Sequence, residues 1–269
     1  MLRTNIEQYT TLVDPLMKEV QQKEIKRILL VASGSSHNAC YCARSFVEKV
    51  SGLEVRIITP YTFTYYENDI KENDLVLVVT QSGLSTNAIE ALKIIKKKQC
   101  RAICLTGNKN SDVKDVADVV IEYGVGEELV GYVTKGVSSL ALFLDLFAIA
   151  YSGKTEYLDE LKKAADLNEE MIDQATNFIQ RHYKNFTSMS WVYSCGAGAN
   201  YGTALESALK MGETIHIPSC CYEIEEYIHG PNLQLTPQYN VIFFDGNDGA
   251  SRRVEQVYKA TRKVSNRAY

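Results

Sequence analysis

The sequence lacks an excess of charge of either sign. Its 269 residues contain 29 Lys and Arg against 33 Asp and Glu, for a net charge of -4. A chain without a basic excess has no electrostatic footprint for nucleic acid or for an anionic membrane. No apolar run reaches the roughly 18 residues that span a bilayer, and the longest candidate, 137–151, is interrupted by Ser138, Ser139 and Asp145. Because the N-terminus is polar and does not resemble a signal peptide, we expect a cytoplasmic protein that binds neither nucleic acid nor membrane.

The usual signatures of metals and nucleotide cofactors are also missing. The seven cysteines include no CxxC pair with a matching partner pair, so we expect buried cytosolic thiols and no zinc site. Gly196, Gly198 and Gly202 resemble a dinucleotide loop, but the strand expected next ends at 217–219 without the acid that binds a ribose. The sequence therefore predicts no metal and no cofactor.

Short apolar runs alternate with helical patterns in the first half of the chain. Residues 1–24 have apolar side chains at helical spacing, and 136–151 form a more apolar helix. Such alternation is typical of a parallel sheet covered on both faces. We predict strands at 28–32, 55–58, 75–79, 102–105 and 119–121, with helices at 38–50 and 86–98 between them.

The alternation resumes after a charged helical stretch at 154–185. Gly34 and Asn38 recur as Gly196 and Asn200, and each pair stands between a predicted strand and a predicted helix. A repeat at a nearly constant offset indicates a duplicated α/β unit. Here we predict strands at 191–194, 215–217 and 241–244, and helices at 204–214 and 250–262.

These patterns divide the chain into four segments, the last of which is shorter than the second, as if it were C-terminally truncated. An incomplete sheet would leave an exposed edge beside 241–244, and we expect such an edge to promote aggregation. The segments are an N-terminal helix at 1–27, a first α/β domain at 28–152, a helical connector at 153–190 and a second α/β domain at 191–269.

Two loops rich in hydroxyl groups, 33–36 and 80–86, follow predicted strands. Ligands of open α/β sheets bind at the carboxyl ends of the strands. Free N–H groups at a helix N-terminus, with added hydroxyl donors, favour a phosphate group. Neither loop contains Lys or Arg, so dipoles would do most of the binding. The alternative for each loop is helix capping, since Ser and Thr are preferred caps.

A third group of polar residues lies in the second α/β domain. Glu206, Lys210 and Glu213 have the spacing of one helix face, and the simplest interpretation is a solvated row of ion pairs. His229 precedes Gly230 and Pro231 in a constrained turn, and an imidazole titrates near neutral pH. The sequence therefore makes His229 an acid/base candidate.

Together, these motifs resemble the sugar isomerase (SIS) family, especially the isomerase half of glucosamine-6-phosphate synthase and the fructosamine-6-phosphate deglycases. The resemblance implies two SIS-type three-layer αβα units with parallel, flavodoxin-like sheets, the second apparently truncated. The motifs are Ser33-Gly34-Ser35-Ser36, the T-Q-S-G-L-S run at 80–85, 131–135 with Val133 and Lys135, 204–213, and His229-Gly230-Pro231.

The resemblance also implies roles for individual residues. Glu213 would move a proton between C1 and C2, and Lys210 would lie near the sugar carbonyl, where it could form an imine. His229 would assist ring opening or act as a partner base, reaching the site across the interface of a homodimer or larger homo-oligomer. A sugar phosphate would be held at its phosphate by Ser35, Ser36, Thr80, Gln81, Ser82 and Ser85, and at its sugar by Ser33 and Gly34.

One departure from the synthases narrows the expected reaction. The chain begins at Met1 and Leu2, with no preceding glutaminase segment and no cysteine nucleophile there. We therefore expect a phosphosugar isomerase or deglycase, acting on a fructosamine 6-phosphate or on an amino-sugar phosphate by aldose–ketose isomerisation. The alternative is a non-catalytic sugar-phosphate sensor or regulatory module.

Overall fold

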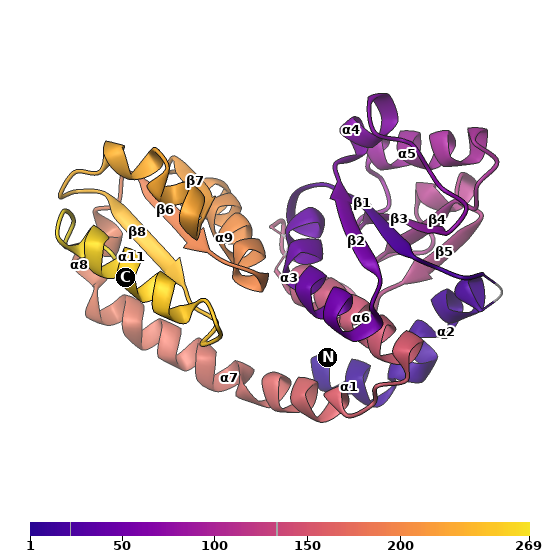
Figure 1. Cartoon of the computed structure of the whole chain (residues 1–269), viewed down its shortest axis with the longest axis horizontal. Helices are drawn as coiled ribbons and strands as arrows, with labels where there is room; N and C mark the ends of the chain where they lie inside the picture. Colours follow the sequence, from indigo (N-terminus) through magenta and orange to yellow (C-terminus); the bar gives the residue numbers. More distant parts are fainter. Residues whose placement is uncertain (22, 133) are drawn as a thin grey trace. The chain divides into compact units, whose positions relative to one another are not determined.

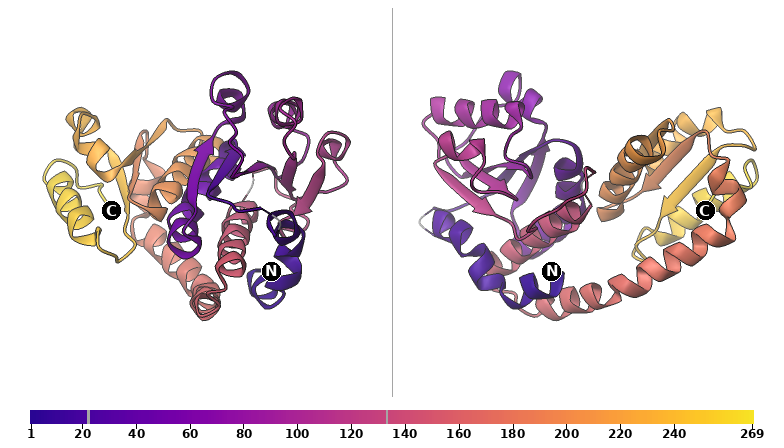
Figure 2. Two further views of the ribbon diagram at one scale, coloured as in Figure 1. Left: turned by 45° about the vertical axis from the view of Figure 1, so that its right-hand side comes forward. Right: turned by 180° about the vertical axis from the view of Figure 1, so that it is seen from behind.

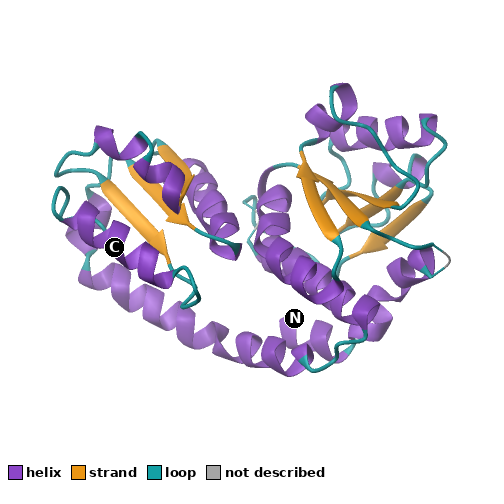
Figure 3. Cartoon of the chain, viewed as in Figure 1, coloured by secondary structure: helices purple, strands orange, loops and turns teal. Residues whose placement is uncertain are grey.

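The computed structural model describes residues 1–21, 23–132 and 134–269, which fall into two compact units. The first unit is Met1–Ala165 and the second is Asp166–Tyr269. Figure 1 labels the elements of each unit, and Figure 3 separates helices from strands. Each unit has a parallel sheet, so the predicted α/β fold class is confirmed.

The first unit is built on five parallel strands in the order β2-β1-β3-β4-β5. β3 is buried at every position, and its register places Leu77 opposite Leu30 of β1. Each predicted strand is confirmed to within a few residues, because continuous apolar runs are buried on both faces of such a sheet. The strands are β1 (Arg27–Ala32), β2 (Glu54–Ile58), β3 (Asp74–Thr80), β4 (Ile103–Thr106) and β5 (Val119–Glu122).

Helices cover both faces of this sheet and form a three-layer arrangement (Figure 2). One face packs against α1 (Leu2–Glu7), α2 (Tyr9–Val20), α3 (Gly34–Ser51) and α6 (Lys135–Ser152). The other face packs against α4 (Pro60–Tyr65), α5 (Thr86–Lys97) and a 3-10 turn at Asp112–Asp115. Among the described residues, α6 is the one helix long and apolar enough to cross a membrane, but most of it is buried in this core.

Three of the predicted helices have wrong boundaries. The helix expected at 204–214 spans Ala199–Lys210. The single helix expected at 1–24 is interrupted at Gln8, whose backbone leaves the helical region, so α1 and α2 are separate. α3 begins at Gly34 rather than at Asn38, since extended Ser33 provides its N-cap position. Ser35 and Ser36 therefore lie in the first turn of a helix rather than in a loop before it.

The second unit contains three parallel strands in the order β7-β6-β8, which matches the order β2-β1-β3 in the first unit. α7 (Tyr157–Arg181) passes from the first unit into the second. The repeated strand order agrees with a duplicated α/β unit, while the interpretation of the second unit as a truncated copy stays a prediction. The other elements are α8 (Tyr183–Thr187), β6 (Val192–Gly196), α9 (Ala199–Lys210), β7 (Ser219–Glu223), α10 (Ile224–Ile228), a 3-10 turn at Pro231–Gln234, β8 (Asn240–Phe244) and α11 (Ser251–Arg262).

The strand predicted at 215–217 is wrong. The chain continues from α9 into a π-helical turn at Met211–Ile215, and His216 then adopts a left-handed conformation with φ of 60°. β7 follows at Ser219–Glu223 and ends on an acid. The strand end at 217–219, which lacks the acid that binds a ribose, is therefore not the end of β7, which is Glu223. The Glu223 carboxylate accepts hydrogen bonds from the backbone N–H groups of Glu225 (2.7 Å) and Glu226 (3.3 Å), and so caps α10.

The exposed edge expected beside 241–244 is also not observed. Residues 267–269 lie parallel to β8, on the side away from β6. Val241 N donates to the carbonyl of Arg267 (3.1 Å), and Tyr269 N donates to the carbonyl of Val241 (2.9 Å). The Tyr269 ring stacks on Phe186 with a centroid distance of 5.1 Å. Pairing with residues 267–269 thus covers an edge that the strand pattern alone left open.

Candidate functional site

The two hydroxyl-rich loops of the first unit lie at the same edge of the sheet. β1 and β3 are parallel neighbours, so their carboxyl ends place 33–36 and 80–85 side by side. Asn87 bridges the loops, because its Nδ2 donates to Ser33 Oγ (3.5 Å) and its Oδ1 accepts from Ser85 Oγ (2.5 Å). Residues 33–36 include the first turn of α3, and 80–85 lead into α5. Free N–H groups at the two helix N-termini therefore favour an anion here.

Asn87 was not among the sequence candidates. It lies in the first turn of α5, two residues after the hydroxyl loop. A polar side chain in the first turn of a helix can contact the loop before it. The position of Asn87 directly after the hydroxyl loop could therefore have identified it in the sequence. Asn87 thus contacts both hydroxyl loops.

Gly83 sets the backbone path of the 80–85 loop. Its φ is +68°, in the left-handed region that favours glycine, and an added Cβ would lie 1.7 Å from Ser111 Oγ. The loop is also held from behind, since the Gln81 carbonyl accepts from Gly107 N (3.0 Å) and from Thr106 Oγ1 (3.3 Å). Ser82 is exposed while Thr80 is buried at the base of the loop. The loop therefore presents its hydroxyl groups from a fixed backbone.

Glu128 is a second residue that the sequence candidates did not include. Its carboxylate accepts hydrogen bonds from Gln81 Nε2 (2.7 Å) and from Thr134 Oγ1 (2.8 Å), Thr134 N (2.9 Å) and Lys135 N (2.9 Å). Burial alone would raise the pKa of Glu128, but these hydrogen bonds outweigh it and lower the pKa to about 2. Spacing could not reveal this residue, because Gln81 lies 47 positions away in the sequence.

His37, which follows the first loop, is held by its neighbours in α3. Its ring contacts Tyr41 edge to face, with centroids 5.1 Å apart. Burial lowers the pKa of His37, and a hydrogen bond with Asn38 opposes that shift in part. A neutral imidazole at this place would act on a ligand as a hydrogen-bonding group and not as a fixed cation.

In the second unit, the structure brings together Lys210 and two carboxylates. Lys210 Nζ lies 2.6 Å from Glu213 Oε2 and 3.3 Å from Glu206 Oε1, so the spacing correctly predicted a shared face. The side chains are 20%, 34% and 15% exposed, respectively, so the row is less solvated than a surface ion-pair row. Burial lowers the pKa of Lys210, but both carboxylates outweigh this effect and the net shift is upward. Lys210 is therefore a cation beside Glu213.

The backbone at Glu213 is distorted. The turn at Met211–Ile215 is π-helical, a rare geometry that is frequent at functional sites. His216, directly after it, is one of three non-glycine residues with positive φ among those the structure describes. A groove of about 740 Å³ opens beside this turn, lined by Leu209, Gly212, Glu213 and the segment 217–222. Glu213 thus faces a space that a small molecule could enter.

His229 ends α10 and is exposed. Gly230 follows with φ of 146°, and Pro231 begins the next turn, so the imidazole stands on a constrained corner. The nearby Glu225 carboxylate pairs with Arg253, which together with His229 lowers the pKa of Glu225. Within the second unit, no described contact joins His229 to Glu213.

Residues 23–150 match the family model of the SIS domain. This part of the chain is a SIS domain. The match covers both hydroxyl loops and α3, α5 and most of α6, so the resemblance inferred from the motifs is confirmed. Val133, which belongs to one of those motifs, lies outside the described residues.

Similar proteins include the glutamine–fructose-6-phosphate aminotransferase (isomerizing) of Caldanaerobacter subterraneus subsp. tengcongensis. The two chains are 29% identical over 217 residues, which are 77% of this chain and 36% of the relative. The chain therefore spans little more than a third of that relative's length.

Solved structures share the fold across the whole chain. A protein of Clostridium difficile 630, described as a candidate phosphosugar isomerase, has a TM-score of 0.87 and 25% identity, with 100% of this chain and 78% of that chain covered. The C-terminal domain of glucosamine-fructose-6-phosphate aminotransferase from Francisella tularensis has a TM-score of 0.85 and 21% identity, with 98% and 79% covered. At 21% identity, the Francisella tularensis structure supports the fold of this chain and no statement about its function.

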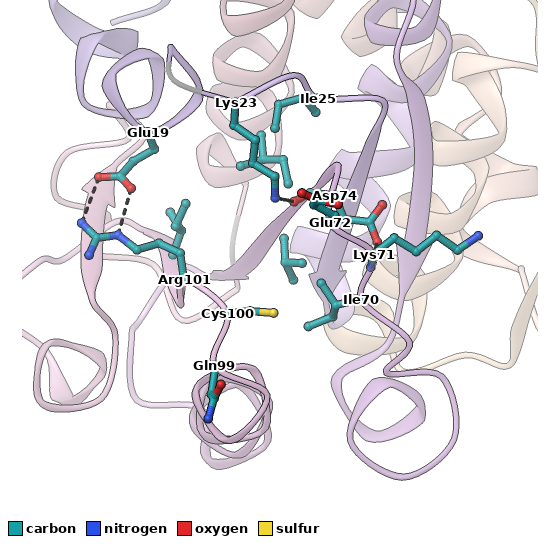
Figure 4. A pocket seen from close by; sticks show the side chains of 13 residues that line it. Glu19, Lys23, Ile25, Ile70, Lys71, Glu72, Asp74, Gln99, Cys100 and Arg101 are labelled. Carbon is teal, nitrogen blue, oxygen red and sulfur yellow. Dashed lines mark hydrogen bonds and ion pairs between the residues drawn. The ribbon is translucent and has the colours of Figure 1, made fainter.

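A cavity in the first unit lies at the edge of the sheet opposite the hydroxyl loops (Figure 4). It has a volume of about 370 Å³ and is lined by segments that precede β1, β3 and β4. Two of its cationic side chains have protein partners: Arg101 forms two hydrogen bonds with Glu19 (3.0 and 3.2 Å), and Lys23 Nζ donates to the Asp74 carbonyl (3.0 Å). Ligands of parallel sheets bind at the other edge, so the hydroxyl loops are the better candidate site. No cluster of three or more His, Cys, Asp or Glu suited to a metal ion occurs among the described residues.

Proposed function

We propose that this protein binds a sugar phosphate and acts on it as a phosphosugar isomerase or deglycase. The observation that carries the proposal is the pair of hydroxyl loops that Asn87 joins at the carboxyl edge of the first sheet. Hydroxyl groups and helix N-termini without a cation suit a dianionic phosphate monoester. We assign the phosphate to Ser35, Ser36, Thr80, Gln81, Ser82 and Ser85, and the sugar to Ser33 and Gly34.

The proposed chemistry is a proton transfer between C1 and C2 of the open-chain sugar. Enolisation requires a base over the carbon and a positive or donor group near the carbonyl oxygen. Glu213 is the proposed base, and Lys210, whose Nζ is 2.6 Å from it, is the proposed cation. Because imine formation needs a neutral amine, the raised pKa of Lys210 supports an electrostatic role over a covalent one.

The preferred reactions are deglycation of a fructosamine 6-phosphate and aldose–ketose isomerisation of an amino-sugar phosphate. His229 is proposed to assist ring opening or to act as partner base, supplied across a homodimer interface. Light scattering tests the dimer directly, and a stable monomer at micromolar concentration would exclude that role for His229.

The activity test is a panel of fructosamine 6-phosphates, including fructoselysine 6-phosphate, with release of glucose 6-phosphate as the readout. Glu213→Gln should reduce the rate by about 10²-fold or more, as expected for loss of a general base. Glu226→Gln is the matched control, since Glu226 is exposed in the same unit. A folded, dimeric protein that turns over no member of the panel would refute the enzymatic proposal.

A sugar-phosphate sensor is the second candidate. The observation that favours it is the Lys210–Glu213 pair itself, which engages the proposed base in an ion pair. Calorimetric binding of a sugar phosphate without turnover would support the sensor. Turnover that depends on Glu213 would exclude it.

A further inference from the structure

Glu128 joins the candidate phosphate loop to the start of α6. One carboxylate oxygen accepts from the Gln81 side chain, and the other accepts from three donors in Thr134 and Lys135. The Lys135 ammonium donates in turn to the carbonyl of Glu127. Glu127 and Glu128 are thereby joined by hydrogen bonds to Thr134 and Lys135.

The carboxylate takes the place of a helix cap. Thr134 occupies the N-cap position of α6 but makes no capping bond to the helix with its side chain, and instead its hydroxyl donates to Glu128. The first N–H groups of a helix lack partners and carry the positive end of its dipole. Because the pKa of Glu128 is lowered to about 2, the group is an anion at neutral pH and suits that place.

The same carboxylate fixes which way the Gln81 amide points. A carboxylate can only accept hydrogen bonds, so the NH₂ end of the amide must face Glu128 and the carbonyl end must face away from it. The Gln81 backbone is already held by Gly107 and Thr106. The remaining N–H and the carbonyl of the Gln81 side chain are thus presented in one fixed orientation beside Ser82.

From these contacts we infer that Glu128 is a positioning residue, which orients the Gln81 amide for a phosphate-bearing ligand. The nature of that ligand rests on the proposed function, whereas the orientation of Gln81 does not. Glu128 does not itself bind the phosphate, since two anions would repel each other. Loss of the Glu128 charge should therefore weaken phosphate binding if Glu128 positions Gln81, and should strengthen it if Glu128 acts only by its charge.

This sign difference makes Glu128→Gln an informative variant. The carbonyl oxygen of the introduced amide should still accept hydrogen bonds from the three donors of Thr134 and Lys135, so the start of α6 stays capped. The NH₂ end of the introduced amide then faces the NH₂ end of Gln81, and the positioning hydrogen bond is lost. Removal of a negative charge would by itself tighten phosphate binding, whereas loss of positioning weakens it. Glu127→Gln removes the same charge from an exposed neighbour and is the matched control.

The experiment combines NMR of the Gln81 side-chain amide in the ligand-free protein with calorimetric titration of inorganic phosphate and glucose 6-phosphate. The Gln81 signals can be assigned by their loss in Gln81→Leu. We expect Glu128→Gln to shift these signals and to weaken binding by about tenfold, the order expected for one hydrogen bond to a charged group. Glu127→Gln should leave the signals unchanged and binding equal or slightly tighter.

Unchanged Gln81 signals in Glu128→Gln would overturn the inference, as would binding as tight as that of the unmodified protein. If the unmodified protein binds neither phosphate compound, the proposed function fails, and the NMR comparison alone then decides the positioning role. If Glu128→Gln does not fold, Glu128→Asp shortens the side chain while keeping its charge. It should shift the Gln81 signals in the same way if the inference holds and leave them unchanged if it does not.

Discussion

Replacement of Gly83 by alanine tests how the candidate phosphate loop is held. At φ of +68° any L side chain is strained, and the new Cβ would lie 1.7 Å from Ser111 Oγ and 2.6 Å from Ser111 Cβ. The left-handed backbone costs about 1–2 kcal/mol, and overpacking against a buried neighbour costs about 1–3 kcal/mol. We therefore expect Gly83→Ala to lower the free energy of unfolding of the first unit by about 2–5 kcal/mol.

Gly52→Ala is the matched control for backbone strain. Gly52 ends α3 with φ of +75°, and a Cβ added there would have no other atom within 4 Å. This variant should show the strain without the clash, so the difference between the two variants isolates the contact with Ser111. Ser111→Ala in the Gly83→Ala background removes the closer contact and should recover part of the loss.

The assay is urea denaturation followed by far-UV circular dichroism and by tryptophan fluorescence. The chain has a single tryptophan, Trp191, which lies in the second unit. Gly83→Ala should shift the dichroism transition more than the fluorescence transition, and it should weaken glucose 6-phosphate binding. Equal stability of Gly83→Ala and Gly52→Ala would refute the close packing of the loop on Ser111.

Three further predictions concern stability and reactivity. Asp74→Asn should cost about 3–5 kcal/mol at pH 7, since it leaves Arg27 without its charged partner in a pair that is 3% and 12% exposed. Burial of Asp74 opposes its ionisation, but Arg27 and Lys71 lower the pKa of Asp74 overall. The stability that the ion pair contributes is therefore present above the unfolded pKa of about 3.9 and is lost as the pH falls through the folded pKa. Urea denaturation should show a smaller difference between Asp74→Asn and the unmodified protein at pH 3 than at pH 7. Gln99→Gly should raise stability by about 1 kcal/mol, because Gln99 has φ of +59° after α5, and an unchanged or lower urea midpoint would contradict this. Brief alkylation of the native protein should label exposed Cys220 before Cys104, because burial raises the pKa of the Cys104 thiol to about 12. Peptide mass spectrometry that finds Cys104 labelled first would contradict the burial pattern.

Most of the first sheet could be predicted from the sequence because its inner strands β1, β3 and β4 are apolar and buried on both faces. β3, for example, is a continuous apolar run with no competing helical pattern. The strand prediction at 215–217 was wrong because the backbone changes conformation within this apolar run. Ile215 and Ile217 are apolar, but a π-helical turn includes the first, and left-handed His216 separates the two. Local composition cannot reveal a change of backbone conformation that tertiary packing determines.

The candidate site was predictable only in part. The hydroxyl groups of 33–36 and 80–85 are visible as motifs, and the Lys210–Glu213 pair follows from helical spacing. Glu128 could not be identified in this way, because its link to Gln81 spans 47 positions and exists only in the folded unit. Asn87 lies nearer its partners, but its bridge between loops depends on the adjacency of β1 and β3. The roles of Lys210, Glu213 and His229 remain predictions.

Calorimetric titration with glucose 6-phosphate and with glucose tests the central claim, that the two hydroxyl loops bind the phosphate of a sugar phosphate. The unmodified protein should bind glucose 6-phosphate and should show no comparable binding of glucose. The double variant Ser82→Ala, Ser85→Ala should lose at least about tenfold in affinity, the order expected from two hydrogen bonds to a charged group. Equal binding of the two sugars, or unchanged affinity in the double variant, would contradict the account.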